Sequence, residues 1–201
     1  MSKIDPGIIA YTYEIDPESV LNSYVNGAFP WPFDSSGLIP WCSPNPRGIL
    51  KFSNFHISKS LSKFLKKHPY QVKFNENFLK VIKSCATIKR PKSQGSWITP
   101  EIIEVYQELF LQGYCYSVEV YEKRKLVAGL YGVRIGNYVT GESMFTTVDN
   151  GSKLALVFLV DKLRSEGLEW LDCQQVTPTL KSFGAEHVTR KKFYSMLSKC
   201  L

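Results

Sequence analysis

The feature that most constrains this chain is the stretch from residue 138 to residue 174, because it predicts a strand, a helix and a second strand in direct succession. Tyr138 to Phe145 is rich in β-prone residues, and Leu168 to Cys173 makes a second short strand. Between them, residues 152–164 carry apolar side chains at helical spacing, after N-cap chemistry at 149–152 and before a stop at Gly167. Two strands joined in this way normally run parallel, with a right-handed crossover.

Polar side chains stand near the ends of both predicted strands, where sites are favoured in such units. They are Glu142 on the first strand, and Asp172 and Gln174 on the second. Strand alternation predicts that Asp172 and Gln174 share one face while Cys173 points the other way. A carboxylate beside a neutral amide suits the handling of an amine, because the carboxylate attracts an ammonium and the amide orients an attacking N–H. The alternative is that all three satisfy local hydrogen bonds.

The rest of the chain predicts an α+β (α/β layered) fold. Helices are expected at 17–26, 56–68, 76–85 and 100–112, a strand at 70–75, and a hairpin of strands 114–121 and 125–133. The order of helix and strand after residue 177 stays open. The aromatic, proline-rich stretch around Trp31 and Trp41 is too interrupted for regular structure. It predicts either a packed cap or the wall of a ligand site.

Composition sets limits on the class of protein. The 201 residues suffice for one domain or slightly more, and no apolar run is long enough for a membrane span or signal peptide, so we expect a cytoplasmic protein. The five cysteines and three histidines have no disulfide or metal-ligand spacing, so no metal is expected. A net charge of +7 leaves a polyanionic partner open.

Part of this positive charge is concentrated in a row of lysines. Lys59, Lys63, Lys66 and Lys67 form one stripe of the predicted helix 56–68, opposite an apolar stripe. This lysine stripe is either a face exposed to solvent or a binding surface for the phosphates of a nucleic acid. A basic loop follows at 87–96, with Lys89, Arg90 and Lys92.

Several motifs together resemble a known family, the leucyl/phenylalanyl-tRNA–protein transferases. They include GAFPW at 27–31, PWCSPNPRGIL at 40–50, SWIT at 96–99, GESMF at 141–145, LDCQ at 171–174 and SFGAEHVTR at 182–190. The resemblance covers nearly the whole chain. It implies a small N-terminal domain (1–52) joined to a GNAT-like acyltransferase domain (53–201). It also implies transfer of Leu, Phe or sometimes Met from aminoacyl-tRNA to an acceptor protein's N-terminal amine, without metal or other cofactor.

The resemblance also implies roles for particular residues. Asp172 and Gln174 would be the catalytic pair, and the lysine stripe would contact tRNA phosphates. The residues implied for the aminoacyl pocket and the terminal adenosine are Tyr24, Trp31, Trp97, Leu130, Glu142, Met144, Leu156, Leu159, Leu163 and Leu171. Acceptors would typically begin with Arg or Lys, and the product would be marked for degradation.

Alternatives stay open at this point. Departures from the family pattern, such as Asn45, Thr177 and Thr179, fall partly on the acceptor side, so acidic N-termini are a second possibility. A non-catalytic RNA-binding module would use only the lysines and aromatics. An acyl-CoA enzyme is disfavoured, because residues 146–153 lack a pyrophosphate-binding loop. A Cys173 nucleophile would need a distant base such as His187.

Overall fold

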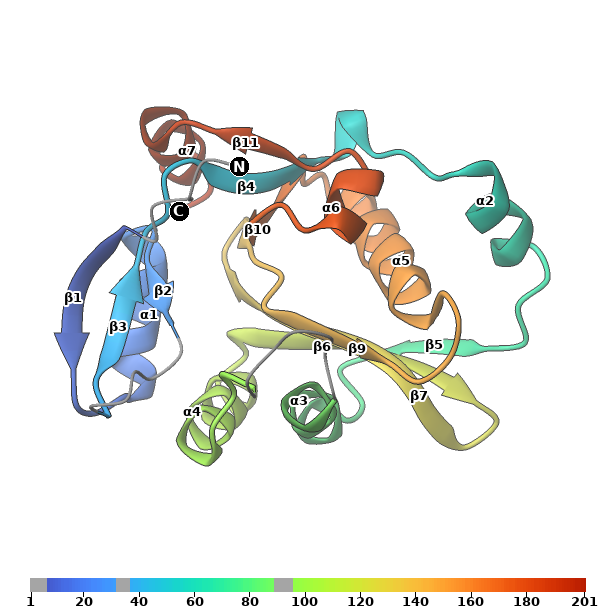
Figure 1. The fold of residues 1–201 in the computed structure, drawn as a ribbon, viewed down its shortest axis with the longest axis horizontal. Coiled ribbons are helices and arrows are strands. Elements are labelled where there is room, and N and C mark those ends of the chain that lie inside the picture. The colour runs from blue at the N-terminus through green and yellow to red at the C-terminus, as the bar shows by residue number, and fades with distance from the viewer. Residues whose placement is uncertain (1–6, 32–36, 89–95) are drawn as a thin grey trace.

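The computed structural model describes residues 7–31, 37–88 and 96–201. Its centre is an antiparallel sheet built on a long hairpin of β6 (Cys115–Glu122) and β7 (Lys125–Ile135) (Figure 1). β5 (Gln71–Phe74) pairs with β6 on the outer side. The predicted hairpin and the strand at 70–75 are therefore confirmed, and the turn between β6 and β7 passes through Lys123 in the left-handed conformation.

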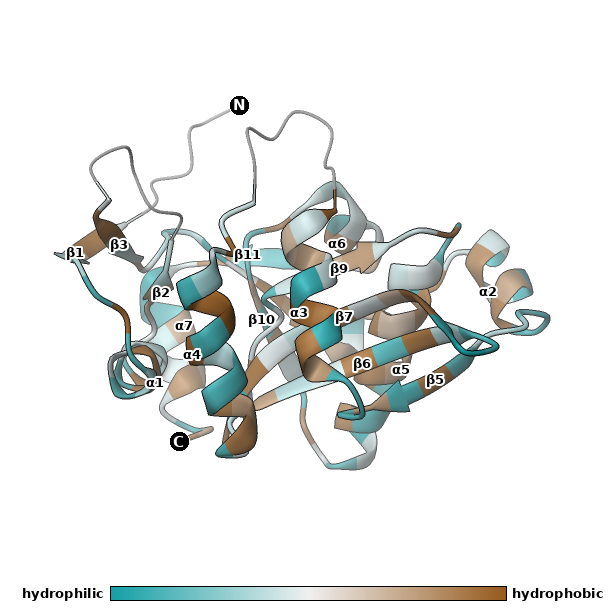
Figure 2. Ribbon diagram, turned by 90° about the horizontal axis from the view of Figure 1, so that it is seen from below, coloured by the Kyte–Doolittle hydropathy of each residue, from teal (hydrophilic) through white to brown (hydrophobic). Residues whose placement is uncertain are grey.

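Helices cover both faces of this sheet (Figure 1). α3 (Phe78–Thr87) and α4 (Pro100–Leu111) lie on one face, and α5 (Gly151–Ser165) lies on the other. Figure 2 shows that α4 carries hydrophobic and hydrophilic residues side by side along its length, as an amphipathic helix does. The result is a layered α+β molecule with one apolar core on each side of the sheet.

Local capping chemistry explains where these helices begin. Thr99 accepts a hydrogen bond from the Ile102 amide at 3.4 Å and is followed by a proline, as predicted for α4. Asn77 caps α3 in the same manner. For α5 the predicted turn is present, but Asn150 takes the left-handed conformation and makes no side-chain cap.

The predicted strand–helix–strand unit is present in modified form. The first strand is split into β8 (Tyr138–Val139) and β9 (Ser143–Thr146), because the chain leaves the sheet between them, and both pieces pair with β7. The second strand is β10 (Trp170–Gln174). The two strands are parallel where they meet, at a single bridge from Thr140 to Asp172. Beyond the bridge they diverge.

A second sheet receives β10 after this divergence. β4 (Arg47–Lys51) is its central strand, flanked by β10 on one side and β11 (Glu186–Val188) on the other, both antiparallel. We did not predict β4 from the sequence. The unsettled C-terminal region is a short helix α6 (Pro178–Ser182), then β11, then α7 (Arg190–Leu197). Segments from both ends of the chain therefore meet here (Figure 1).

The N-terminal part forms a third, small sheet. α1 (Pro17–Val25) begins at the predicted cap Asp16. β1 (Ile8–Thr12), β3 (Ile39–Cys42) and β2 (Phe29–Pro30) pair in that order. The expectation of no regular structure in the aromatic stretch is thus wrong at Phe29–Pro30 and Ile39–Cys42, and again at β4. Buried Trp41 anchors this sheet through a hydrogen bond from Nε1 to Thr12 Oγ1 of 2.9 Å.

The lysine stripe lies on a short helix. After a 3₁₀ turn (Phe52–Asn54), α2 covers Lys59–Leu65, capped by Ser58, which makes it shorter than the predicted 56–68. Lys66 and Lys67 follow in the closing turn, and the stripe is exposed throughout. The other expected basic residues, Lys89, Arg90 and Lys92, lie outside the described residues. Among the helices that the structure describes, none is long and apolar enough to cross a membrane.

Candidate active site

The divergence of β9 and β10 leaves a cavity of about 470 Å³ between the strands. Its lining comes from segments spread along the whole chain, from β2 to α6. The residues are Phe29, Pro30, Trp31, Trp97, Leu130, Tyr131, Gly141, Glu142, Ser143, Met144, Leu156, Leu159, Leu171, Cys173, Gln174, Gln175, Thr177, Thr179 and Leu180. Two of the three polar residues predicted at the strand ends, Glu142 and Gln174, line this cavity.

One wall of the cavity is apolar. It is formed by a residue of β7, one of β9, two of α5 and one of β10, namely Leu130, Met144, Leu156, Leu159 and Leu171. Leu156 and Leu159 share a helical face, as expected from their spacing. The wall presents aliphatic and thioether surface to the cavity.

Two tryptophans form another part of the lining. Trp31 follows β2, and Trp97 lies just before α4; both are partly exposed. Partly exposed indole rings offer flat apolar surfaces, which suit a planar ring such as a nucleobase.

The polar centre of the cavity is a pair of side chains from the two diverging strands. Gln174 donates from Nε2 to Glu142 Oε1 at 2.7 Å. The same oxygen accepts from Thr140 Oγ1 at 2.6 Å. An amide and a carboxylate thus face the cavity as one hydrogen-bonded unit.

The environment of Glu142 changes its titration. Burial raises its pKa to about 7, against the opposing effect of hydrogen bonds from Thr140, Tyr24 and Gln174, while the charge of Asp172 adds to the rise. A carboxyl group with such a pKa accepts and releases protons near neutral pH.

Asp172 lies behind this unit and does not line the cavity. Its side chain is fully buried, and its carboxylate is occupied by protein donors. Oδ1 accepts from Arg47 Nε at 3.0 Å and from the backbone N–H of Gln174 at 2.9 Å. Oδ2 accepts from Arg47 Nη2 at 2.7 Å and from the Tyr138 hydroxyl at 2.5 Å.

The predicted alternation along β10 is wrong at its end. The register against β4 shifts between Asp172 and Gln174, and Gln174 has a left-handed φ of 57°. This bulge turns Gln174 toward the cavity, so that Gln174 and Cys173 both line it while Asp172 does not. Short strands that end in a bulge break the period of two on which the prediction depended.

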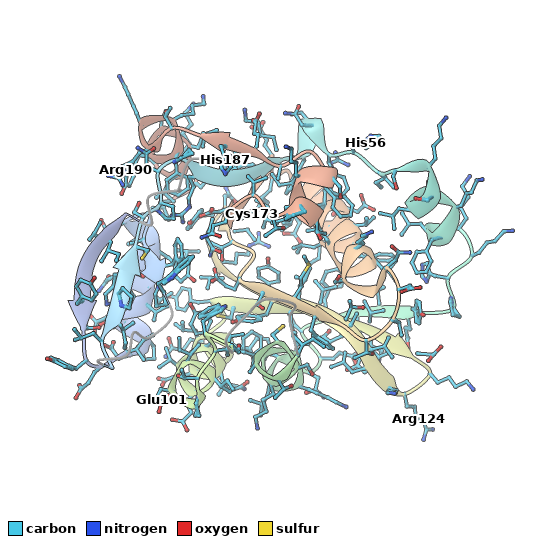
Figure 3. All side chains as sticks on the ribbon, viewed as in Figure 1. His56, Glu101, Arg124, Cys173, His187 and Arg190 are labelled. Carbon is cyan, nitrogen blue, oxygen red and sulfur yellow. The ribbon has the colours of Figure 1, made fainter. Side chains whose placement is uncertain are left out.

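Cys173 does not have the environment of a nucleophile. Burial, and then the charge of Asp172, raise the pKa of its thiol well above its ordinary value. His187, the base considered from the sequence, is exposed on β11 (Figure 3). The thiol therefore stays protonated at neutral pH.

Two residues of the expected pocket lie behind its wall instead. Tyr24 is fully buried and its hydroxyl pairs with that of Tyr106 at 2.9 Å, so it supports Glu142 from outside the cavity. Leu163 packs in the core one turn beyond Leu159 and does not line the cavity. The remaining residues implied for the pocket, from Trp31 to Leu171, do line it.

Arg47 and Tyr138, the two side chains that hold Asp172, were not predicted from the sequence. Gln175 and Leu180 were not predicted to line the cavity either. The available signal was Arg47 at the start of the apolar run Gly48–Leu50, since an arginine that enters a buried strand needs a buried anionic partner. Within residues 7–31, 37–88 and 96–201, no three His, Cys, Asp or Glu side chains are grouped so as to hold a metal ion.

The layered fold thus brings an apolar wall, an amide and a carboxylate together in one cavity. Two family models match the chain: "Leucyl/phenylalanyl-tRNA protein transferase" over residues 49–198, and the N-terminal domain of the same family over residues 13–45. The chain belongs to the leucyl/phenylalanyl-tRNA–protein transferase family, and it is an enzyme of that class.

Curated relatives agree along nearly the whole length. The transferase of Pseudoalteromonas atlantica is 43% identical over 196 residues, which are 98% of this chain and 83% of the relative. That of Sulfurimonas denitrificans is 43% identical over 195 residues, 97% of this chain and 84% of the relative. Among solved structures, a GCN5-related N-acetyltransferase from Kribbella flavida has a TM-score of 0.43 and 11% identity, covering 72% of this chain and 55% of that chain.

Proposed function

We propose that this enzyme moves leucine, phenylalanine or methionine from the 3′ end of aminoacyl-tRNA to the N-terminal amine of an acceptor protein. The observation that carries the proposal is the cavity, in which an apolar wall, two tryptophans and the Gln174–Glu142 pair lie together. The apolar wall would hold the aminoacyl side chain, and Trp31 and Trp97 would hold the terminal adenosine. Stacking of one base on an aromatic side chain contributes about 1–3 kcal/mol.

In the proposed reaction, the nitrogen of the acceptor amine attacks the ester carbonyl carbon. A C–N bond forms, and the C–O bond to the ribose breaks. Since Gln174 Nε2 donates to Glu142, its carbonyl oxygen is the atom that accepts an N–H of the incoming amine and orients it. Glu142, with its pKa near 7, takes the proton that the amine loses. The ribose oxygen takes a proton from solvent.

Asp172 has an indirect role in this proposal. Its oxygens are occupied by Arg47, Tyr138 and the backbone of Gln174, so it acts as a positioning residue that holds the amide in place. This differs from the direct contact with the acceptor amine that the sequence led us to expect.

The charge of the cavity supports acceptors that begin with Lys or Arg. Of the described residues that line it, Glu142 alone has an ionisable acidic or basic side chain at neutral pH. An acidic N-terminal residue would meet this carboxylate without a compensating cation, whereas a basic one would be attracted to it. The product would begin with a bulky apolar residue, and we propose that it is marked for degradation in the cytoplasm.

The lysine stripe of α2 is proposed as the contact for tRNA phosphates. Lys59, Lys63, Lys66 and Lys67 are exposed, and no acidic residue lies within α2. Lysines would meet phosphates as point charges rather than in the bidentate manner of arginine.

The test is transfer of labelled leucine from Leu-tRNA to peptides beginning with Lys, Arg, Asp, Glu or Ala. We expect product with Lys and Arg, and a fall in kcat of about 100-fold for Gln174→Ala, since one oriented polar group contributes about that factor. Gln112→Ala, an exposed glutamine after α4, is the matched control and should leave the rate unchanged. Transfer to Asp or Glu instead would replace the proposed acceptor class, and full activity of Gln174→Ala would refute the role of the amide.

A further inference from the structure

Arg47 is the most completely buried cation that the structure describes, and the proposed reaction does not use it directly. It is the first residue of β4, its exposed fraction is 0%, and its partner Asp172 is equally buried. The guanidinium contacts the carboxylate through Nε and Nη2, at 3.0 Å to Oδ1 and 2.7 Å to Oδ2. This is the bidentate geometry that arginine provides and lysine does not.

The other contacts of Arg47 come from remote parts of the chain. Nη1 donates to the carbonyl oxygen of Gly27 at 3.0 Å. The guanidinium carbon lies 4.8 Å from the ring centre of Phe29 and 4.4 Å from that of Phe193. The cation is thus held between a ring of the N-terminal sheet and a ring of α7, in cation–π contact with both.

Asp172 transmits this placement to the cavity. While Oδ2 is held by Arg47 and Tyr138, Oδ1 accepts the backbone N–H of Gln174. Gln174 has a left-handed φ of 57°, a conformation that a residue with a Cβ adopts only when its surroundings hold it there. The hydrogen bond to Asp172 is one of those constraints, and it directs the amide toward Glu142.

Tyr138 completes the arrangement. Burial, and then the charge of Asp172, raise the pKa of Tyr138 well above its ordinary value, so the hydroxyl keeps its proton and donates it. Its bond to Oδ2 and the bonds from Nε and Nη2 of Arg47 leave the Asp172 carboxylate a single direction in which to face.

We propose that Arg47, together with Tyr138, is a positioning residue of the transfer reaction, which fixes the Gln174 amide through Asp172. Through Gly27, Phe29 and Phe193, the same guanidinium ties the orientation of the amide to the N-terminal sheet and to α7. The inference rests on the proposed role of Gln174, and it assigns to a buried ion pair an effect on the chemical step in addition to any effect on stability.

The experiment compares three conservative variants by kcat, by KM for Leu-tRNA and for a Lys-initiated peptide, and by Tm. Arg47→Lys keeps the charge and loses the bidentate contact. Tyr138→Phe removes one hydroxyl that donates to a buried carboxylate at 2.5 Å. Ser117→Ala is the matched control, because Ser117 donates to the carboxylate of Glu119 at the same 2.5 Å and is equally buried, but touches neither Asp172 nor the cavity.

We expect kcat to fall about 100-fold for Arg47→Lys and about 10-fold for Tyr138→Phe at unchanged KM, because misplacement of a reacting group by about 1 Å costs about 10²-fold. Ser117→Ala should lower Tm comparably and leave kcat within about 2-fold. In single turnover with enzyme in excess, adding Tyr138→Phe to Gln174→Ala should cause no further loss, since both changes act through one amide.

Three outcomes would overturn the inference. One is that Tyr138→Phe and Ser117→Ala lower Tm equally and both leave kcat unchanged, which would make the ion pair purely structural. Another is that the losses from Tyr138→Phe and Gln174→Ala multiply, which would mean that the tyrosine acts elsewhere. If Gln174→Ala itself keeps full kcat, the proposed role of the amide fails as well, and the two failures are thereby distinguished.

Discussion

At the scale of single residues, Glu142 combines two roles that oppose each other. It lines the cavity, yet burial of its carboxyl group disfavours the charged form and raises its pKa to about 7, from an ordinary 4.5. An ordinary surface glutamate would be ionised throughout the physiological range and would be a poorer proton acceptor for an amine. The environment that tunes this residue for chemistry should therefore cost folding stability.

The stability cost of Glu142 has a predictable sign. Between pH 4.5 and about 7 the folded state holds a proton that the unfolded state has lost, so the free energy of unfolding falls as pH rises through this window. Glu142→Gln cannot lose a proton. We expect the variant to be more stable than the parent by about 1–3 kcal/mol at pH 8 and to have no advantage at pH 4. Urea denaturation at both pH values measures the difference.

Glu166→Gln serves as the control, because its effect on the free energy of unfolding at pH 8 should have the opposite sign. Hydrogen bonds from Lys162, and further contacts with Arg134, lower the pKa of Glu166 despite partial burial, so its ionised form stabilises the fold above its normal pKa. This variant should be less stable than the parent at pH 8. A difference between Glu142→Gln and the parent that does not change with pH would contradict the assignment of a raised pKa.

Among the elements, α2 is proposed to bind tRNA but does not line the cavity where the reaction is proposed to occur. Its lysines lie on a short helix outside the cavity, so their charges affect attraction of a polyanion rather than the reacting groups. We expect Lys63→Gln with Lys67→Gln to weaken tRNA binding and to reduce the slope of log affinity against log salt by about 1.4–1.8, the amount for two phosphate contacts. Filter binding over a series of salt concentrations measures the slope.

The control removes two charges elsewhere. Arg124 and Lys125 are exposed at the β6–β7 turn, and Figure 3 shows Arg124 at the tip of this hairpin. Changing both to glutamine should leave the slope nearly unchanged, apart from the general loss of net charge. An equal reduction in both double variants would show that only overall charge matters, and α2 would then be a solvated face.

The elements also show which parts of the fold could be predicted from sequence. α1 and α4 were predictable because their caps and their apolar spacing are local, and so was the β6–β7 hairpin. β4 was not, because a five-residue strand after several prolines has no local signal, and its partners lie far along the chain. The amide and carboxyl groups were found by chemistry and resemblance, but the bulge at Gln174 and the pairing of Asp172 with Arg47 depend on tertiary contacts.

At the scale of the whole molecule, β4 joins parts that would otherwise be separate. Arg47 contacts Phe29 of the N-terminal sheet, and the strand pairs with β10 and β11. The expected division into domains 1–52 and 53–201 stays a prediction, yet shared contacts of this kind favour a single cooperative transition. We expect urea unfolding followed by tryptophan fluorescence and by far-UV circular dichroism to give coincident curves. An earlier transition by fluorescence alone would reveal an N-terminal unit that unfolds independently.

The position of β4 has a consequence for biosynthesis. Arg47 precedes its partner Asp172 by 125 residues. At about 5–20 residues per second, β4 leaves the ribosome about 6–25 seconds before β10, the first of the two strands that cover its edges. During that interval an apolar segment has both edges open to aggregation, while the β6–β7 hairpin, whose contacts are local, can already form. A nascent chain released in this interval would lack Asp172 and Gln174, so the enzyme becomes competent only after β10 has been made.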